Sequence, residues 1–167
     1  MYERSHYTFR WWYEYSGGQM TDWGAHHLDI AQWGLAMDGS GPVSIEGEGT
    51  FPTRGIYETA MRFEVRYEYA TGQEVICSST GRGAKFLGEE GWIHVGRHGY
   101  LKASREGIIE NRPAMPKGVS PVELHHRNWL RLIRTRRRPV CDVAIGCQST
   151  TVALLGCIAH WTGRALT

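Results

Sequence analysis

The stretch Ala60-Met61-Arg62-Phe63-Glu64-Val65-Arg66-Tyr67-Glu68-Tyr69 decides the fold class of this 167-residue chain. Apolar or aromatic side chains alternate with charged ones along it, and successive side chains of a strand point to opposite faces of a sheet. The next four residues, Ala70-Thr71-Gly72-Gln73, are typical of a hairpin turn. The stretch therefore predicts a strand of an antiparallel sheet that has one buried face.

Further short strands are expected on the C-terminal side of this hairpin. Glycine or charged turns separate them, which is typical of a meander. The predicted strands cover residues 74–78, 84–87, 91–95, 100–103 and 108–110. On the N-terminal side, residues 9–15 are aromatic and are predicted to be extended.

Three helices are predicted, and a sheet of this kind must bury one face against helices. The first covers residues 19–36, after a glycine pair. The second starts at Ser120-Pro121 and stops before Pro139, and the third covers residues 143–161 between the cap Asp142 and a terminating glycine. We therefore predict an α+β fold: an open, predominantly antiparallel sheet with helices packed on one face, in two layers.

Length and composition indicate one domain, since 167 residues suffice for one sizeable core and are few for two. The formal net charge of +2 predicts no nucleic-acid partner, and the arginine-rich run 134–138 fits a solvated helix C-terminus. Polar residues such as Gln148 interrupt the apolar run of the last helix, so no membrane partner is expected.

The four cysteines form no Cys-x-x-Cys pair and lie in apolar segments, which predicts buried, reduced thiols. The chain shows no N-terminal secretion signal. A cytoplasmic location is the expectation from these features.

The first predicted helix carries an unusual set of polar residues. Asp22, His26, Asp29 and Trp33 are spaced i, i+4, i+7 and i+11, which places them on one helical face. Histidine has a pKa suited to taking a hydroxyl proton near neutral pH, and a carboxylate one turn away could orient its ring or bind a substrate hydroxyl. Taken alone, Asp22 and His26 could equally be a structural pair.

A metal site is the competing interpretation of this helix, because His27 adds a second imidazole. Adjacent residues of a helix point about 100° apart, so His26 and His27 do not easily face one ion. We predict no metal site.

Three segments resemble the Gfo/Idh/MocA family of sugar dehydrogenases (glucose-fructose oxidoreductase, inositol dehydrogenase and rhizopine catabolism). The first is the Gly-Gly pair followed by Asp22-x-x-x-His26 and then Asp29; the others are residues 88–95 and 126–141. The resemblance covers essentially the whole chain. It implies that residues 1–167 are a C-terminal substrate-binding and oligomerisation domain, and that a dinucleotide-binding domain precedes the point where this chain starts.

The resemblance also implies a function: an NAD(P)-dependent oxidoreductase acting on a sugar, polyol or keto-sugar. The catalytic residues would be His26, as acid/base, and Asp22. The predicted substrate-binding residues are Asp29, Trp11, Trp12, Arg10, His27 and Trp33. The family's partner lysine lies in a Glu-Lys-Pro motif that this chain lacks, and NAD or NADP would be bound mainly by the other domain. The isolated chain is therefore expected to be inactive.

Two alternatives stay open at this point. Transient oxidation could serve a glycosidase-type elimination within the same family, or the chain could be a non-catalytic module that associates through its sheet. A homodimer or homotetramer through the sheet face is expected, because Tyr57, Phe63, Tyr67 and Tyr69 would offer an aromatic surface.

Overall fold

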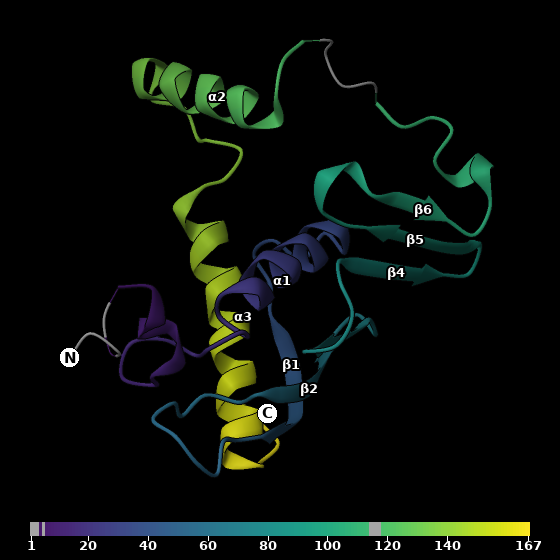
Figure 1. The fold of residues 1–167 in the computed structure, drawn as a ribbon. Coiled ribbons are helices and arrows are strands. Elements are labelled where there is room, and N and C mark those ends of the chain that lie inside the picture. The colour runs from purple at the N-terminus through teal and green to yellow at the C-terminus, as the bar shows by residue number, and fades with distance from the viewer. Residues whose placement is uncertain (1–3, 5, 114–117) are drawn as a thin grey trace.

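The computed structural model describes residues 4, 6–113 and 118–167 and confirms the α+β class. All strand pairs are antiparallel, but the strands form two separate three-stranded sheets (Figure 1). Sheet A contains β1 (Pro42–Thr50), β2 (Arg62–Tyr69) and β3 (Glu74–Ser78) in that order. Sheet B contains β4 (Ala84–Gly88), β5 (Gly91–Val95) and β6 (Leu101–Ala103).

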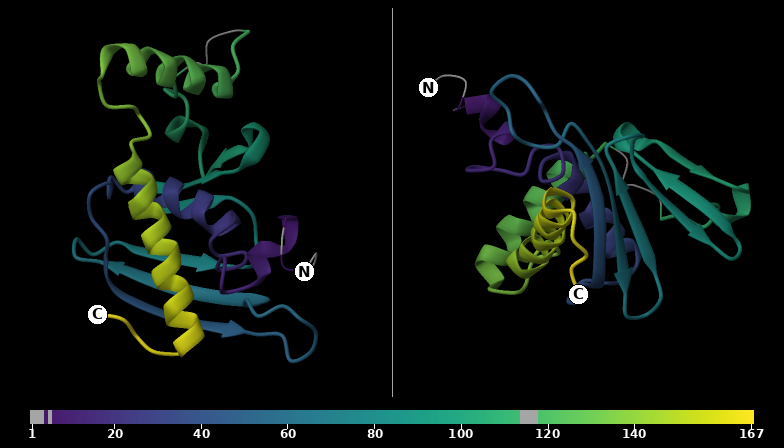
Figure 2. Two further views of the ribbon diagram at one scale, coloured as in Figure 1. Left: turned by 90° about the vertical axis from the view of Figure 1, so that its left-hand side faces the viewer. Right: turned by 90° about the horizontal axis from the view of Figure 1, so that it is seen from below.

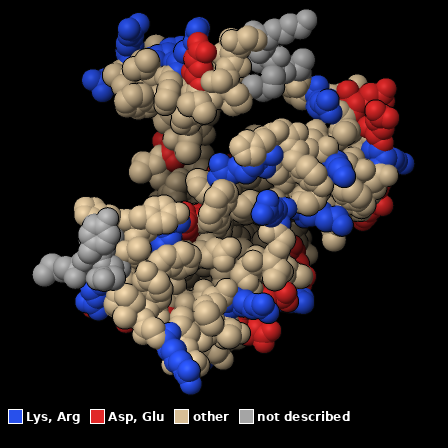
Figure 3. Space-filling model, viewed as in Figure 1, with Lys and Arg blue, Asp and Glu red and all other residues tan. Residues whose placement is uncertain are grey.

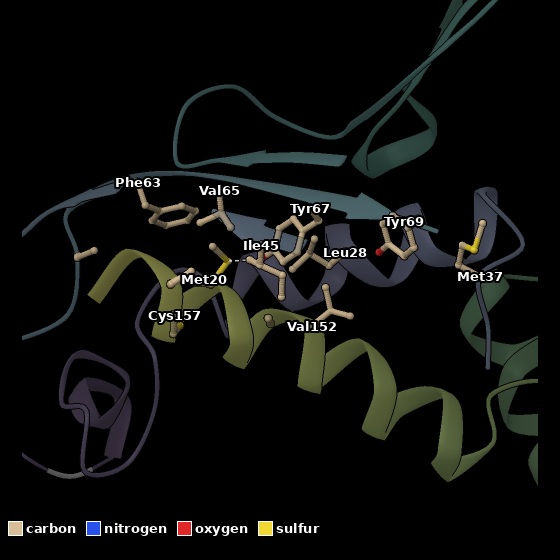
Figure 4. Close-up of a cluster of buried hydrophobic side chains, with 13 residues drawn as sticks. Met20, Leu28, Met37, Ile45, Phe63, Val65, Tyr67, Tyr69, Val152 and Cys157 are labelled. Carbon is tan, nitrogen blue, oxygen red and sulfur yellow. Dashed lines mark hydrogen bonds between the residues drawn. The ribbon is translucent and has the colours of Figure 1, made fainter. Parts of the chain in front are cut away.

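The core lies between sheet A and two helices, α1 (Trp23–Gly34) and α3 (Val143–Thr162). Strand β2 alternates strictly between exposed and buried residues, as its sequence predicts. Tyr67 is fully buried, and a Cβ on Gly156 of α3 would lie only 2.0 Å from the Tyr67 hydroxyl. Helix and sheet approach closely there because α3 has no side chain at that position (Figure 4).

The aromatic residues proposed for an oligomer surface occupy the core instead. Phe63, Tyr67 and Tyr69 face the helices and are at most 7% exposed, so the reason given for that surface is wrong. The outer face of sheet A is charged, because the alternating partners on β2 are Arg62, Glu64, Arg66 and Glu68. Of the four aromatic residues predicted to form this surface, only Tyr57, in the β1–β2 connection, is exposed.

Helix α3 crosses the strands of sheet A (Figure 2, left). The Asp142 carboxylate caps it by accepting from the Ala144 amide at 2.9 Å, and Gly163 ends it in a left-handed conformation, so both predicted boundaries are confirmed. By length and composition α3 would be apolar enough to cross a membrane. Here one side of it covers sheet A and α1.

Helix α2 (Pro121–Thr135) stands away from the core, although all three helices were expected to pack on the sheet (Figures 1 and 2). The Ser120 hydroxyl caps it by accepting from the Glu123 amide, as predicted. It makes no extensive contact with any other helix or strand of the described residues. Trp129 and Ile133 therefore stay exposed.

Three local predictions are wrong. Residues 9–15 are not extended: they belong in part to the 3-10 helix η2 (His6–Trp11), and Tyr15 and Ser16 both bond back to the Trp12 carbonyl. Aromatic residues favour strands because they pack well on a sheet, and no strand in the described part of the chain pairs with this segment. Residues 108–110 lie at the short helix η4 (Glu106–Ile108) instead of in a strand. Two of the four cysteines, Cys141 and Cys147, are exposed.

Candidate functional site

The glycine pair before α1 fixes where that helix begins. A Cβ on Gly17 would lie 2.5 Å from the Cys157 sulfur of α3, and Gly18 has φ +68° and lies equally close to Thr59. Both contacts require a residue without a side chain, and the positive φ favours glycine as well. The chain turns here through residues 18–22, and α1 begins at Trp23, later than predicted.

Asp22 precedes α1 and forms an ion pair with Arg10 instead of contacting His26. It makes no side-chain capping bond to the helix, and the pair is only partly exposed. The Arg10 guanidinium also lies 4.2 Å from the centre of the Tyr7 ring and 5.9 Å from that of Trp11. Two of the predicted site residues, Asp22 and Arg10, are thus brought together, with Trp11 beside them.

His26 is exposed on the first turns of α1, beside the indole of Trp23. The two rings are 6.2 Å apart in an edge contact. His27 stacks on the same indole at 6.3 Å, and its Nδ1 lies 2.8 Å from the Trp23 carbonyl oxygen. Trp23 is 48% exposed, so this cluster is open to a ligand.

Asp29 points toward α3, where its carboxylate accepts a hydrogen bond of 2.6 Å from the buried hydroxyl of Ser149. Trp33, at the far end of the predicted face, is 75% exposed. The side chains of the predicted face therefore diverge. Asp22 pairs with the N-terminal segment, Asp29 with α3, and His26 and Trp33 are left in solvent.

The aromatic residues of the N-terminal segment meet the β1–β2 connection. Trp11 is half-buried and tilted against Tyr57 at 6.4 Å, and together they line a shallow pocket of about 220 Å³. Trp12 also contacts Tyr57, but only 7% of it is exposed, which leaves little of its ring for a ligand.

The described residues contain no group of three or more His, Cys, Asp or Glu side chains placed to hold a metal ion. The two glycine-rich turns, residues 39–41 and 81–83, lead into β1 and β4. A dinucleotide phosphate is bound where such a loop leads into a helix, so neither turn fits that cofactor.

Cys157 is buried and Cys77 is partly buried. Burial raises the pKa of the Cys157 thiol to about 12 and that of Cys77 to about 11, and only the thiolate is reactive. The histidines of α1 are His26, whose imidazole is exposed, and His27, which is half-buried.

Sequence reasoning missed three residues of this region. Trp23 is not among the predicted site residues, yet it contacts both histidines. Arg97 reaches it from the β5–β6 turn, and Ser149 reaches Asp29 from α3. Both contacts join segments far apart in the chain, so no local sequence pattern predicts them.

Comparison with known proteins gives a match over residues 1–167 to a family model of the Gfo/Idh/MocA group, described as "Oxidoreductase family, C-terminal alpha/beta domain". No curated protein matches the chain significantly. Many solved structures do, all of those described below at low sequence identity.

Three of these structures represent the fold similarity. The aldose-aldose oxidoreductase from Caulobacter crescentus, complexed with glycerol, has a TM-score of 0.69 at 16% identity over 92% of this chain and 48% of that one. The WlbA dehydrogenase from Bordetella pertussis, in complex with NADH and UDP-GlcNAcA, has a TM-score of 0.68 at 16% identity over 99% and 50%. The UDP-N-acetylglucosamine 3-dehydrogenase GnnA from Acidithiobacillus ferrooxidans has a TM-score of 0.60 at 15% identity over 83% and 47%. The chain thus spans about half the length of the proteins it resembles.

Proposed function

Because this chain belongs to the Gfo/Idh/MocA family of oxidoreductases as a C-terminal α/β domain, we propose that it supplies the substrate-binding and catalytic helix of an NAD(P)-dependent enzyme. The substrate is a sugar, polyol or keto-sugar, and His26 is the acid/base. The observation that carries this proposal is the exposed imidazole of His26 on α1, placed beside an open indole and free of any ion pair with Asp22.

The proposed reaction oxidises a secondary alcohol. His26 takes the hydroxyl proton while the hydride leaves the same carbon. When bound, NAD or NADP would supply the hydride acceptor, and a dinucleotide-binding domain outside this chain would hold most of it. In the reverse direction His26 returns the proton to the carbonyl oxygen.

Asp22 has a different role in this proposal from that of orienting His26. Its carboxylate is paired with Arg10 and is partly exposed, so it can still accept a hydrogen bond from a substrate hydroxyl. Arg10 and the exposed part of Trp11 lie beside this carboxylate. Aromatic rings of this kind stack on the apolar face of a sugar ring.

The same arrangement supports the proposed substrate class. Several proteins of the same fold are described with carbohydrate or polyol ligands, among them UDP-GlcNAcA and glycerol. The open cluster of the Trp23 indole and the imidazoles of His26 and His27 suits such polyhydroxy compounds, because each hydroxyl can both donate and accept.

The test is hydride transfer by this chain fused to a dinucleotide-binding domain of the family, followed by NAD(P)H absorbance with a panel of sugars and polyols. We expect His26→Ala to lower kcat about 10²- to 10⁴-fold, the usual contribution of general acid–base catalysis. His125→Ala is the matched control, because His125 is an exposed histidine on the detached α2. An active fusion in which His26→Ala has no effect would favour the non-catalytic module.

Association of the chain with itself is a second part of the proposal. The outer face of sheet A is exposed and charged, and the Arg66–Glu74 ion pair lies on it. A homodimer or homotetramer that uses this face is held by ionic contacts, so light scattering should show it at low salt and its dissociation at high salt. A monomer at low salt would contradict this.

A further inference from the structure

The turn between β5 and β6 brings a cation to the start of α1. Arg97 begins the short helix η3 (Arg97–Gly99), and its guanidinium carbon lies 5.0 Å from the centre of the Trp23 ring. Arg97 is exposed and forms no ion pair with a carboxylate of the described residues. Its planar group is therefore available to an anion.

The neighbouring carboxylates of α1 do not neutralise this cation. Asp22 is paired with Arg10, and Asp29 accepts from Ser149. The groups that share the Trp23 indole with Arg97 are the two imidazoles of His26 and His27. A ligand that reaches His26 over this indole thus meets an uncompensated positive charge.

The turn that carries Arg97 is fixed by its own backbone. Gly96 donates to the Tyr100 carbonyl at 2.9 Å, and Tyr100 donates back to the Arg97 carbonyl at 3.2 Å. Between them His98 has φ 58° and ψ 33°, a left-handed conformation that costs a residue with a side chain about 1 kcal/mol or more. Strain of this kind is common at ligand-binding turns.

Sheet B also carries basic side chains near α1. Lys85, His94 and Lys102 are cross-strand partners and form a basic row over the three strands. Figure 3 shows Lys and Arg side chains along this sheet, with Asp and Glu gathered at its far end. Glu90, in the β4–β5 turn, is paired with Arg105. The end of the sheet nearest α1 is therefore the basic one.

We propose that Arg97 is a specificity-determining residue that binds an anionic group of the sugar substrate, with Trp23 as the floor of that subsite. The inference rests on the proposed function of His26. A guanidinium matches a carboxylate or a phosphate through two parallel hydrogen bonds, so the substrate is a sugar that carries one of these groups. A uronate would bring a carboxylate, and a nucleotide sugar would bring a diphosphate.

The experiment titrates the chain with four probes and follows the indole N–H resonance of Trp23, which Trp23→Phe identifies. The probes are glucose, glucuronate, UDP-glucose and inorganic phosphate. We expect glucuronate, UDP-glucose or both to bind about 10- to 100-fold more tightly than glucose, the range of a charge-assisted pair. Arg97→Gln should remove this advantage without changing glucose binding, and Arg97→Lys should restore part of it.

Arg105→Gln is the matched control, because Arg105 is an exposed arginine at the acidic end of the same sheet. It should leave all four affinities unchanged. Tighter binding of glucuronate alone identifies a carboxylate subsite, and tighter binding of UDP-glucose alone identifies a diphosphate subsite.

Two results would overturn the inference. If Arg97→Gln binds the anionic sugars as tightly as the wild type does, or if glucose binds as well as they do, Arg97 has no such role and the proposed function of His26 is untouched. If inorganic phosphate binds as tightly as either anionic sugar, Arg97 is a general anion site and no sugar specificity follows.

Discussion

Sheet A and sheet B have the same number of strands and the same antiparallel pairing, yet they are buried very differently. Strand β2 of sheet A alternates between buried and exposed residues, whereas every residue of β5 in sheet B is half-buried. Two helices cover one face of sheet A, while the closest packing of sheet B on a helix is at α1, where Phe86 meets Gly34. The comparison indicates that sheet A contributes most of the buried core, and it leaves sheet B and the exposed side of α1 for the binding surface that we propose.

The largest expected effect on stability comes from replacing one tyrosine in each sheet. Tyr67 is fully buried and Tyr100, beside β6, is 42% exposed. We expect Tyr67→Ala to lower the free energy of unfolding by about 3–5 kcal/mol, the usual cost of deleting a buried ring. Tyr100→Ala should cost about 1 kcal/mol or less. Urea denaturation of both variants measures the difference, and equal losses would refute the division.

A smaller effect is expected where sheet B meets α1. A Cβ on Gly34 would lie 2.4 Å from the Phe86 ring, so Gly34→Val must displace that ring and should destabilise the chain by about 1–3 kcal/mol. Gly41→Val is the matched control, since no atom lies within 4 Å of a Cβ built there. Thermal unfolding that does not distinguish the two variants would show that sheet B is not docked on α1.

The smallest effect concerns His160 of α3, which is 3% exposed and lies between Phe63 and Phe51. Neither of its ring nitrogens has a hydrogen-bond partner among the described residues. Burial lowers the pKa of this imidazole below its ordinary value of about 6.5. As the pH falls, this histidine is therefore protonated in the unfolded chain before it is protonated in the folded one. The contribution of His160 to the free energy of unfolding is fully present above about pH 6.5 and is lost as the pH falls below that value.

Replacing this histidine isolates its contribution. His160→Phe should leave the unfolding free energy near pH 8 similar or higher and should remove part of the loss at acidic pH. His126→Phe, at an exposed position of α2, is the control and should keep the wild-type pH dependence. A wild-type pH profile in His160→Phe would show that this imidazole is not buried in its neutral form.

Local sequence signals predicted much of the fold. The alternation over β2, the turn at Gly72, and the caps Ser120 and Asp142 are all contained in a few consecutive residues. The failures depend on long-range contacts. The sequence of residues 9–15 does not show whether a strand will pair with this segment. The strands of sheets A and B have similar composition, so the sequence does not show that they form two sheets.

The candidate site divides in the same way. Helical spacing predicted one shared face for Asp22, His26 and Asp29, but Asp22 precedes α1. The spacing does not show that Arg10 pairs with Asp22 or that Ser149 binds Asp29. Those partners come from 12 and 120 residues away along the chain. Arg97 was missed for the same reason, since only the folded β5–β6 turn brings it to Trp23.

The central claim is that the imidazole of His26 transfers the substrate proton, and chemical rescue tests it most directly. The measurement is hydride transfer by the fused His26→Ala enzyme with and without added imidazole, beside Asp22→Ala treated identically. We predict that imidazole restores activity to His26→Ala by about tenfold or more and does not restore it to Asp22→Ala. Full activity of His26→Ala without imidazole would contradict the claim.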